Sequence, residues 1–197
     1  LGTVNRILVV RQHNQFGDML AGVSLFRAIK EKYPESHLTV IASPENSIGV
    51  IKNSFVDDVI VFDKTKIYNP FHFIRFLKKI RSGYDIAVVP ATVSVSFTSN
   101  FIARISKSRI RIGPNSLDGI PNPGSFLFDR RVDLDWRKYP DSNVAEHILE
   151  IIKPFGFDTK DISSQISIEE SDIHEAKKYS NKIDTLTENT IIIQIHD

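Results

Sequence analysis

The sequence predicts an α/β fold built on a doubly wound parallel sheet. Short, nearly continuous apolar runs alternate with longer amphipathic runs along most of the 197 residues. Strands that are covered by helices on both faces have this character, because neither face meets water. No fixed-period repeat or low-complexity tract offers another architecture. A chain of this length can also bury a sizeable core without disulfides or structural metals.

Strands and helices are expected to alternate through the first 112 residues. The expected strands are 6–10, 37–42, 59–62, 85–89 and 109–112. The expected helices are 17–33, 44–52, 71–80 and 93–106. Pro34 should end the first helix, because proline cannot continue the hydrogen-bonding pattern. In the third helix, Phe71, Phe73 and Phe76 should lie mostly in the core, although an exposed aromatic stripe could touch a membrane surface.

The alternation breaks at residues 114–140, where glycine, proline, asparagine and charged residues gather. This stretch is predicted to be a long loop with one short strand at 125–128, and long loops in compact domains are often functional. A helix over 143–155 should follow, with Asp141 or Ser142 as its N-cap and Gly156 just past its end.

A helix at 171–183 and an apolar strand at 190–195 are predicted for the remaining residues. A parallel strand is usually followed by a helix, so this ending suggests that a second half is missing. Residues 1–185 are therefore expected to form one domain. Residues 186–197 are expected to be a linker and the first strand of a second domain.

Charge and composition exclude several classes of protein. The chain has 25 Lys and Arg against 24 Asp and Glu, and this balance argues against a general nucleic-acid binder. It contains no cysteine, which rules out disulfides, Cys-based zinc sites and cysteine nucleophiles. Neither an apolar run of about 18 residues nor a signal peptide is visible. A soluble protein of the cytoplasm is the expectation.

The turn between the first strand and the first helix is the strongest candidate site. Ligands of open parallel sheets bind at the carboxyl ends of the strands. In this turn Gly17 would allow close approach of a ligand, and the helix dipole would stabilise the anion of Asp18. Asp18 could instead serve only as a helix cap. The glycine-rich motifs GxGxxG and GxxxxGK[ST] are both absent here, so nucleotide binding by those routes is not expected.

Residues 7–46 (ILVVRQHNQFGDMLAGVSLFRAIKEKYPESHLTVIASPEN) resemble glycosyltransferase family 9, the ADP-heptose:lipopolysaccharide heptosyltransferases. The resemblance rests on an arginine after the strand, followed by Phe-Gly-Asp and a helix that ends near Tyr-Pro. Weaker similarities are a Tyr-Asp strand at 84–89, an Arg-x-Gly turn at 111–113, the helix 146–156 and the strand 193–196. The chain departs from the family pattern at Ser24, where proline is common, and at Asn143, where histidine is usual.

The resemblance implies the N-terminal half of a two-domain GT-B glycosyltransferase, with a Rossmann-like domain that receives the acceptor. It implies that Asp18 is the general base, which takes the proton of the attacking sugar hydroxyl. A nearby anion would also stabilise a transition state that resembles an oxocarbenium ion. The whole protein would transfer a heptose or related sugar from an ADP-sugar or another nucleotide-sugar to a lipopolysaccharide core.

Other polar residues near this turn are candidates for substrate binding. Arg11 could bind a carboxylate or phosphate, or simply form a salt bridge. The expected sugar contacts are His13, Asn14, Gln15, Gly17 and Ser94, although His13 could be a solvated loop residue and the serine could cap the next helix.

No metal and no cofactor are expected. Asp133 and Asp135 imitate an Asp-x-Asp metal motif, but they lie in a strongly charged segment, and the six histidines are scattered. The predicted partners are the nucleotide-sugar donor and a glycolipid acceptor, with peripheral contact at the inner membrane and no nucleic acid. The chain by itself should be inactive, because most donor contacts would lie in the second domain. Two alternatives remain, a non-catalytic α/β glycan- or ligand-binding domain and an enzyme of another GT-B family.

Overall fold

The computed structural model describes residues 3–12, 15–166 and 170–180, and it divides the chain into two units, Leu1–Ile166 and Ser167–Asp197. In the described part, the first unit contains a seven-stranded sheet in which β1 is central and the order is β3-β2-β1-β4-β5. The short β6 pairs antiparallel with β5, and β7 pairs parallel with it. The strands are β1 (Arg6–Arg11), β2 (His37–Ala42), β3 (Asp58–Val61), β4 (Ile86–Val88), β5 (Ile110–Leu117), β6 (Ile120–Pro121) and β7 (Arg130–Leu134). The predicted doubly wound sheet is confirmed.

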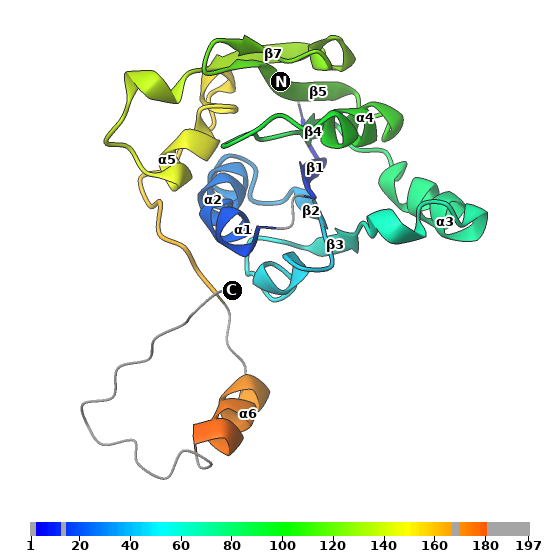
Figure 1. The fold of residues 1–197 in the computed structure, drawn as a ribbon, viewed down its shortest axis with the longest axis vertical. Helices are drawn as coiled ribbons and strands as arrows, with labels where there is room; N and C mark the ends of the chain where they lie inside the picture. Colours follow the sequence, from blue (N-terminus) through cyan, green and yellow to red (C-terminus); the bar gives the residue numbers. More distant parts are fainter. Residues whose placement is uncertain (1–2, 13–14, 167–169, 181–197) are drawn as a thin grey trace. The chain divides into compact units, whose positions relative to one another are not determined.

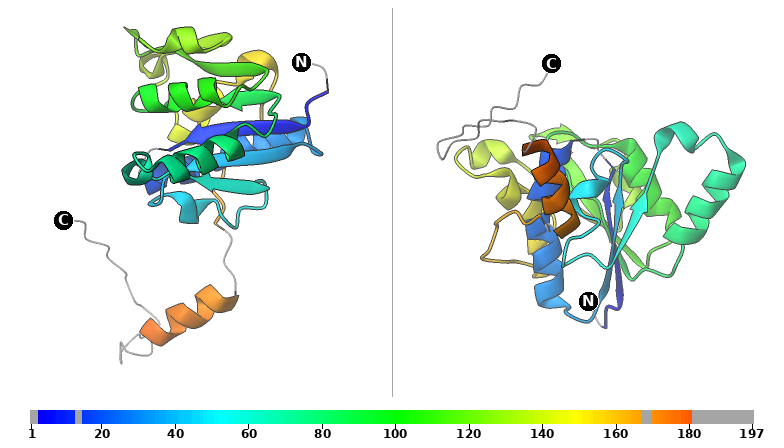
Figure 2. Two further views of the ribbon diagram at one scale, coloured as in Figure 1. Left: turned by 90° about the vertical axis from the view of Figure 1, so that its right-hand side faces the viewer. Right: turned by 90° about the horizontal axis from the view of Figure 1, so that it is seen from below.

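Helices cover both faces of this sheet (Figures 1 and 2). One face carries α1 (Phe16–Ala21), α2 (Val23–Lys32) and α5 (Val144–Leu149), and the other carries α3 (Pro70–Ile80) and α4 (Phe97–Ile105). The period of two in β1 explains why both faces are apolar. Ile7 and Val9 lie in the core under α2, whereas Leu8 and Val10 lie in the core under α3 and α4.

The predicted helix 17–33 is divided into α1 and α2 at Gly22. The Gly22 N–H donates to the carbonyl oxygens of both Asp18 (3.2 Å) and Met19 (3.0 Å), so the backbone is tighter here than in a regular α-helix. A Cβ at this position would lie 2.9 Å from the Met19 carbonyl oxygen. The close approach of the Met19 carbonyl oxygen therefore favours glycine at this position.

Two other predicted helices and one predicted set of buried side chains differ from the structure. Residues 44–52 contain only a 3₁₀ turn, Ser47–Gly49. The helix predicted at 93–106 begins later, at Phe97, because the Ser96 hydroxyl accepts from the Ser99 N–H and caps it. The expected aromatic core of α3 is wrong in part, since Phe71 is 84% exposed while Phe76 packs on Phe62.

The prediction of a long loop at 114–140 is wrong. β5 continues to Leu117 and turns at Asp118-Gly119 into β6, and β7 then returns beside β5. Asp118 and Gly119 both have positive φ, at 51° and 79°, as a two-residue type I′ hairpin requires. Residues 125–128, predicted as a strand, instead contain the 3₁₀ turn Ser125–Leu127. The alternation of Val132 and Leu134 with charged residues is the signal of an edge strand here.

Gly113 lies inside β5 and not in the Arg-x-Gly turn that the sequence suggested. A Cβ on this glycine would lie 2.2 Å from the Phe128 ring. Phe128 is buried in the core under α3 and α4. The missing side chain therefore lets an aromatic ring lie directly on the strand.

The late helix α5 begins with a capping box, which corrects the N-cap predicted at Asp141 or Ser142. The Asn143 side chain accepts from the N–H groups of Ala145 and Glu146, and the Glu146 carboxylate accepts from the Asn143 N–H. Ser24 on α2 donates to the Ala145 carbonyl oxygen at 2.8 Å and so joins the two helices. Both positions that depart from the family pattern thus have structural roles here.

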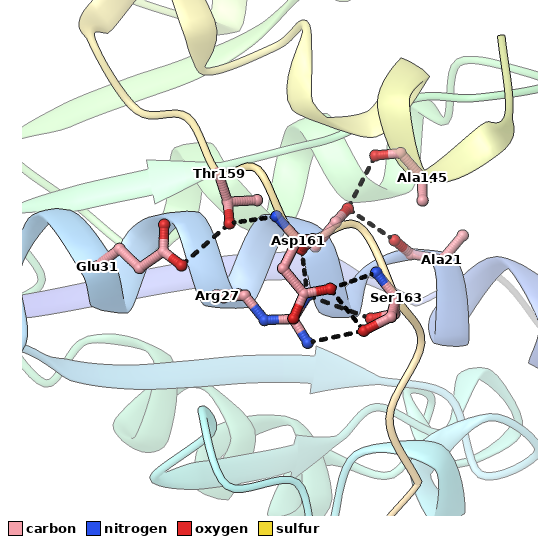
Figure 3. A network of polar contacts seen from close by, with 8 residues as sticks. Ala21, Arg27, Glu31, Ala145, Thr159, Asp161 and Ser163 are labelled. Carbon is pink, nitrogen blue, oxygen red and sulfur yellow. Dashed lines mark hydrogen bonds and ion pairs between the residues drawn. The ribbon is translucent and has the colours of Figure 1, made fainter.

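Polar contacts also hold the segment after α5 along α2 (Figure 3). Arg27 donates to the carbonyl oxygens of Asp161 and Ser163, and Glu31 accepts from the Thr159 hydroxyl at 3.0 Å. The left-handed Gly156 (φ 75°) ends the turn Lys153–Phe155, as predicted for the end of this helical region.

In the second unit, the structure describes α6 (Glu170–Ser180). The end of the predicted helix 171–183, the predicted strand 190–195 and the domain boundary at 185 lie outside the described residues. In the described part of the chain, no helix is long and apolar enough to cross a membrane.

Candidate functional site

The end of β1 directs two consecutive polar side chains to opposite faces of the sheet. Because side chains alternate along a strand, Arg11 follows Val9 toward α1, and Gln12 follows Val10 toward α4. Both side chains are buried, at 2% and 1% exposure. Two buried polar side chains therefore lie at the carboxyl end of the central strand.

Arg11 is the last residue of β1 rather than a residue beyond it, and it holds the start of α1. Its Nη2 donates to the Asp18 carbonyl oxygen at 2.9 Å and lies 3.6 Å from the carboxylate oxygen Oδ2 of the same residue. Burial lowers the pKa of Arg11 to about 10, although the negative charge of Asp18 opposes this shift. The guanidinium is still cationic at neutral pH and lies beside a carboxylate whose side chain is 17% exposed.

The carboxylate of Asp18 does not serve as a helix cap. Gln15 is the N-cap residue of α1, and no side-chain hydrogen bond caps this helix. Asp18 lies in the first helical turn and accepts from the Thr92 hydroxyl at 3.5 Å. Thr92 follows β4, which lies next to β1. From β1 the chain first adds β2 and β3 on one side and then adds β4 and β5 on the other, so the direction of strand addition changes between β1 and β4. Asp18 thus lies at the topological switch point, where ligands of such sheets bind.

Trp136 fixes the position of Thr92 from a part of the chain that sequence reasoning assigned to a loop. The indole Nε1 donates to the Thr92 carbonyl oxygen at 2.6 Å. The indole ring is stacked on His147 of α5, with centroids 4.3 Å apart and an interplanar angle of 1°. The His147 Nε2 in turn contacts the Ser142 hydroxyl. The pairing of β7 with β5 brings Trp136 here, so the missed strand also concealed this contact.

Gln12 joins β1 to the start of α4. Its Nε2 donates to the hydroxyls of Ser96 (3.0 Å) and Ser99 (3.1 Å), while its Oε1 has no partner within the described residues. Asn46 ties the same edge to β2, because its side-chain amide donates to the Arg11 carbonyl oxygen at 3.2 Å. Neither residue was proposed as a site residue from the sequence, and for Gln12 the available signal was a polar residue directly after a buried strand.

The remaining predicted site residues are exposed or lie outside the described part. Gln15 and Gly17 are exposed at the start of α1, and a Cβ on Gly17 would meet no atom within 4 Å among the described residues outside its own helix. Among the described residues, neither packing nor a positive φ requires this glycine. Ser94 is exposed in the loop after β4. His13 and Asn14 lie outside the described residues.

A surface hollow of about 320 Å³ lies at the same edge of the sheet, beyond the end of β3. Its lining includes Phe62, Lys66 and His72, and Asp18 is not part of it.

The Asp133–Asp135 pair is engaged with protein groups. Asp133 accepts from the Ser116 hydroxyl (2.5 Å) and the Asn115 amide (2.8 Å), and Asp135 pairs with Arg137 at 2.7 Å. Among residues 3–12, 15–166 and 170–180, no group of three or more His, Asp or Glu side chains is placed to hold a metal ion.

Fold and site together define an α/β domain of the Rossmann-like class, with a carboxylate at the switch point of its parallel sheet. No protein-family model and no curated protein matches this sequence. The fold is nevertheless found in solved glycosyltransferases. A family 9 glycosyl transferase from Veillonella parvula superposes with a TM-score of 0.72 at 16% identity, over 92% of this chain and 50% of that chain.

Two structures from E. coli share this similarity. The ADP-heptose lipopolysaccharide heptosyltransferase II gives a TM-score of 0.64 at 19% identity, over 93% of this chain and 51% of that one. The heptosyltransferase WaaC, solved with ADP, gives 0.63 at 14% identity, over 83% and 51%. This chain therefore has the fold of one half of the GT-B glycosyltransferases seen in family 9, and it spans about half the length of those chains.

Proposed function

We propose that this chain is the acceptor-binding, N-terminal half of a GT-B glycosyltransferase that uses Asp18 as its general base. The whole protein would transfer a heptose or related sugar from an ADP-sugar or another nucleotide-sugar to a lipopolysaccharide core. Such an enzyme would act in the cytoplasm. The observation that carries this proposal is the place of Asp18, at the switch point of the sheet and beside the exposed Gly17.

The reaction assigns a defined task to the carboxylate. The oxygen of an acceptor hydroxyl forms a bond to the anomeric carbon, and the bond from that carbon to the diphosphate breaks with its electron pair. The nucleoside diphosphate leaves, and the hydroxyl proton passes to Asp18. The same negative charge stabilises the cationic character that the sugar ring gains in the transition state.

The neighbours of Asp18 suit this task. Arg11 is buried beside Asp18 and hydrogen-bonds to its backbone carbonyl oxygen. The backbone that carries the carboxylate is therefore held in place, and a cation lies next to the carboxylate. The Thr92 hydroxyl donates to the Asp18 oxygen Oδ2, and within the described residues the other oxygen, Oδ1, has no hydrogen-bond donor and is proposed to meet the substrate proton. Such preorganisation reduces the cost of orienting the base in the transition state.

Substrate contacts are proposed for the residues around this turn. Gln15 and Gly17 are exposed there, and Ser94 is exposed after β4, so each is accessible to a sugar. His13 and Asn14 belong to the same turn in the sequence. Arg11 is proposed to act mainly through Asp18, because its guanidinium is buried.

Most of the donor contacts are proposed to lie outside these residues. The chain spans about half the length of the similar structures. Ligand sites often lie in the cleft between two domains, so the other half would supply much of the donor site. Residues 1–185 would then form the acceptor domain, and residues 186–197 would lead into the donor domain. Residues 1–197 alone should not transfer sugar.

A transfer assay of the full-length protein tests this proposal. It would be run with a panel of ADP- and UDP-sugars and a lipopolysaccharide core acceptor, with release of nucleoside diphosphate as the readout. Transfer from at least one donor supports the proposal. Tight binding of the glycan without turnover of any donor would support the alternative, a non-catalytic α/β glycan-binding domain.

A further inference from the structure

The helix α3 and the turn before it carry a concentration of positive charge. Residues 64–81 contain six Lys and Arg and no Asp or Glu, whereas the whole chain has a net charge of only +1. The rest of the chain is therefore net negative. We call residues 64–81 the basic segment, and its six cations are Lys64, Lys66, Arg75, Lys78, Lys79 and Arg81.

Most of these cations are not neutralised by neighbours. Lys66 pairs with Asp63 at 3.0 Å, and the Arg81 Nε donates to the Ile105 carbonyl oxygen. The other four have no ion pair with any residue in the described part of the chain, and all four are exposed. Their charge is thus available to an anionic partner.

Large apolar side chains project from the same surface. The inner side of α3 is formed by Phe76, Leu77 and Ile80, which pack on the sheet. Phe71 and Ile74 lie on the outer side, with exposed fractions of 84% and 52%. Residues three positions apart are neighbours on one helix face, so these two side chains adjoin each other. Tyr68, in the turn before α3, is 90% exposed.

The helix is formed before any partner binds. The Asn69 side chain accepts from the Phe71 N–H at 3.0 Å, and Pro70 occupies the first helical turn. α3 lies on the opposite face of the sheet from α2 and α5 (Figures 1 and 2). Binding through α3 would therefore require little ordering of the chain.

We propose that the basic segment docks on a membrane surface that is rich in anionic lipids. The helix would lie in the plane of the interface, with Tyr68, Phe71 and Ile74 entering the boundary between headgroups and acyl chains. The lysines would reach the lipid phosphates, since their long stems can lie along apolar surface while the ammonium groups stay in the polar layer. Aromatic side chains beside unpaired lysines favour a bilayer interface over a protein partner, which would need acids at fixed positions.

This proposal does not depend on transferase activity. The basic segment contains neither Asp18 nor any residue that contacts its carboxylate. Loss of membrane binding and loss of sugar transfer can therefore be measured separately. A failure of one leaves the other intact.

Vesicle sedimentation of the full-length protein tests the proposal. One set of vesicles would contain phosphatidylglycerol and phosphatidylcholine, and the other phosphatidylcholine alone. We expect binding to the anionic vesicles, and weakening by added salt. Lys78→Gln with Lys79→Gln should weaken the partition by about 25-fold, at about fivefold for each charge near the surface. Phe71→Ser with Ile74→Ser should weaken it by at least about tenfold, from the loss of apolar burial.

A matched control variant changes residues outside the basic segment. Phe126→Ser with Lys160→Gln removes an aromatic side chain that is 65% exposed and an exposed lysine, and should leave vesicle binding within about twofold. Circular dichroism should show that every variant keeps the wild-type spectrum. Three results would overturn the proposal: equal binding to neutral vesicles, equal loss in the control variant, or loss only in variants that no longer fold. Equal affinity for a DNA or RNA duplex, lost in the same variants, would overturn the assignment to lipid.

Discussion

Trp136 donates a hydrogen bond from its indole Nε1 to the carbonyl oxygen of Thr92, at a distance of 2.6 Å. Thr92 in turn contacts the Asp18 carboxylate. Trp136, which follows β7, thus helps to position Thr92 beside the carboxylate of Asp18, which follows β1. This relation makes Trp136 a positioning residue for the proposed base.

The change Trp136→Phe should lower turnover of the full-length enzyme by about tenfold, because small displacements of a catalytic group are costly. Phenylalanine keeps an aromatic ring for His147 but lacks the N–H donor, so the free energy of unfolding should fall by only about 1 kcal/mol. In an Asp18→Asn background the same change should have little further effect on turnover. Additive losses in the double variant would show that Trp136 acts independently of Asp18.

Gly113→Ala should reduce the free energy of unfolding by about 2 kcal/mol, because the new methyl group overlaps the buried Phe128 ring. As a control, Gly113→Ala would also be made in a Phe128→Ala background, where the ring that the new methyl group overlaps is absent. There the added methyl group should cost much less. Equal costs in the two backgrounds, measured by denaturant titration, would refute the packing account.

Asp85 should contribute stability that is lost in acid. Burial alone would raise its pKa, but hydrogen bonds from the Asn5 and Arg6 N–H groups and the charge of Arg109 together lower it. A lowered pKa in the folded state stabilises the protein above the ordinary value of about 4, and this contribution disappears as pH falls through the folded pKa. Asp85→Asn should therefore destabilise the protein at pH 7 and flatten the dependence of unfolding free energy on pH below about 4. An unchanged acid slope would contradict this assignment.

Residues 1–197 alone should bind ADP-sugars and UDP-sugars with a dissociation constant no better than about millimolar. The reason is that the donor is proposed to be held mainly by the other half of the enzyme. Isothermal titration calorimetry measures this directly. Micromolar affinity would mean that the donor site lies in this half and that the proposed roles of the two domains are reversed.

Much of the sheet was predictable because its strands are buried on both faces. β1 is a continuous apolar run and β2 is interrupted only by Thr39, so local pattern alone places both strands. β7 was missed because an edge strand has one polar side, and its Arg, Asp and Lys neighbours resemble a loop. The Asp118-Gly119 hairpin turn was the signal that could have identified the extended β5.

The candidate site shows the same limit. Gly17-Asp18 is local in sequence, and its place at the carboxyl edge of the sheet follows from the order of strand and helix. The contacts of Thr92 with Asp18 and with Trp136 join positions 74 and 44 residues apart. Such pairs depend on strand order and register, which no local pattern contains. The exposure of Phe71 was likewise misjudged, because helical periodicity does not say how much of α3 the sheet covers.

The central claim, that Asp18 is the general base, is tested most directly by the turnover of Asp18→Asn in the full-length enzyme. Asparagine keeps the size of the side chain but cannot take the proton, so turnover should fall by about 100-fold or more. Stability should fall by about 2 kcal/mol, since the buried Arg11 loses its anion but keeps its bond to the carbonyl oxygen. The matched control Asp141→Asn, at an exposed acid, should leave turnover unchanged. Turnover of Asp18→Asn within about twofold of wild type would contradict the account.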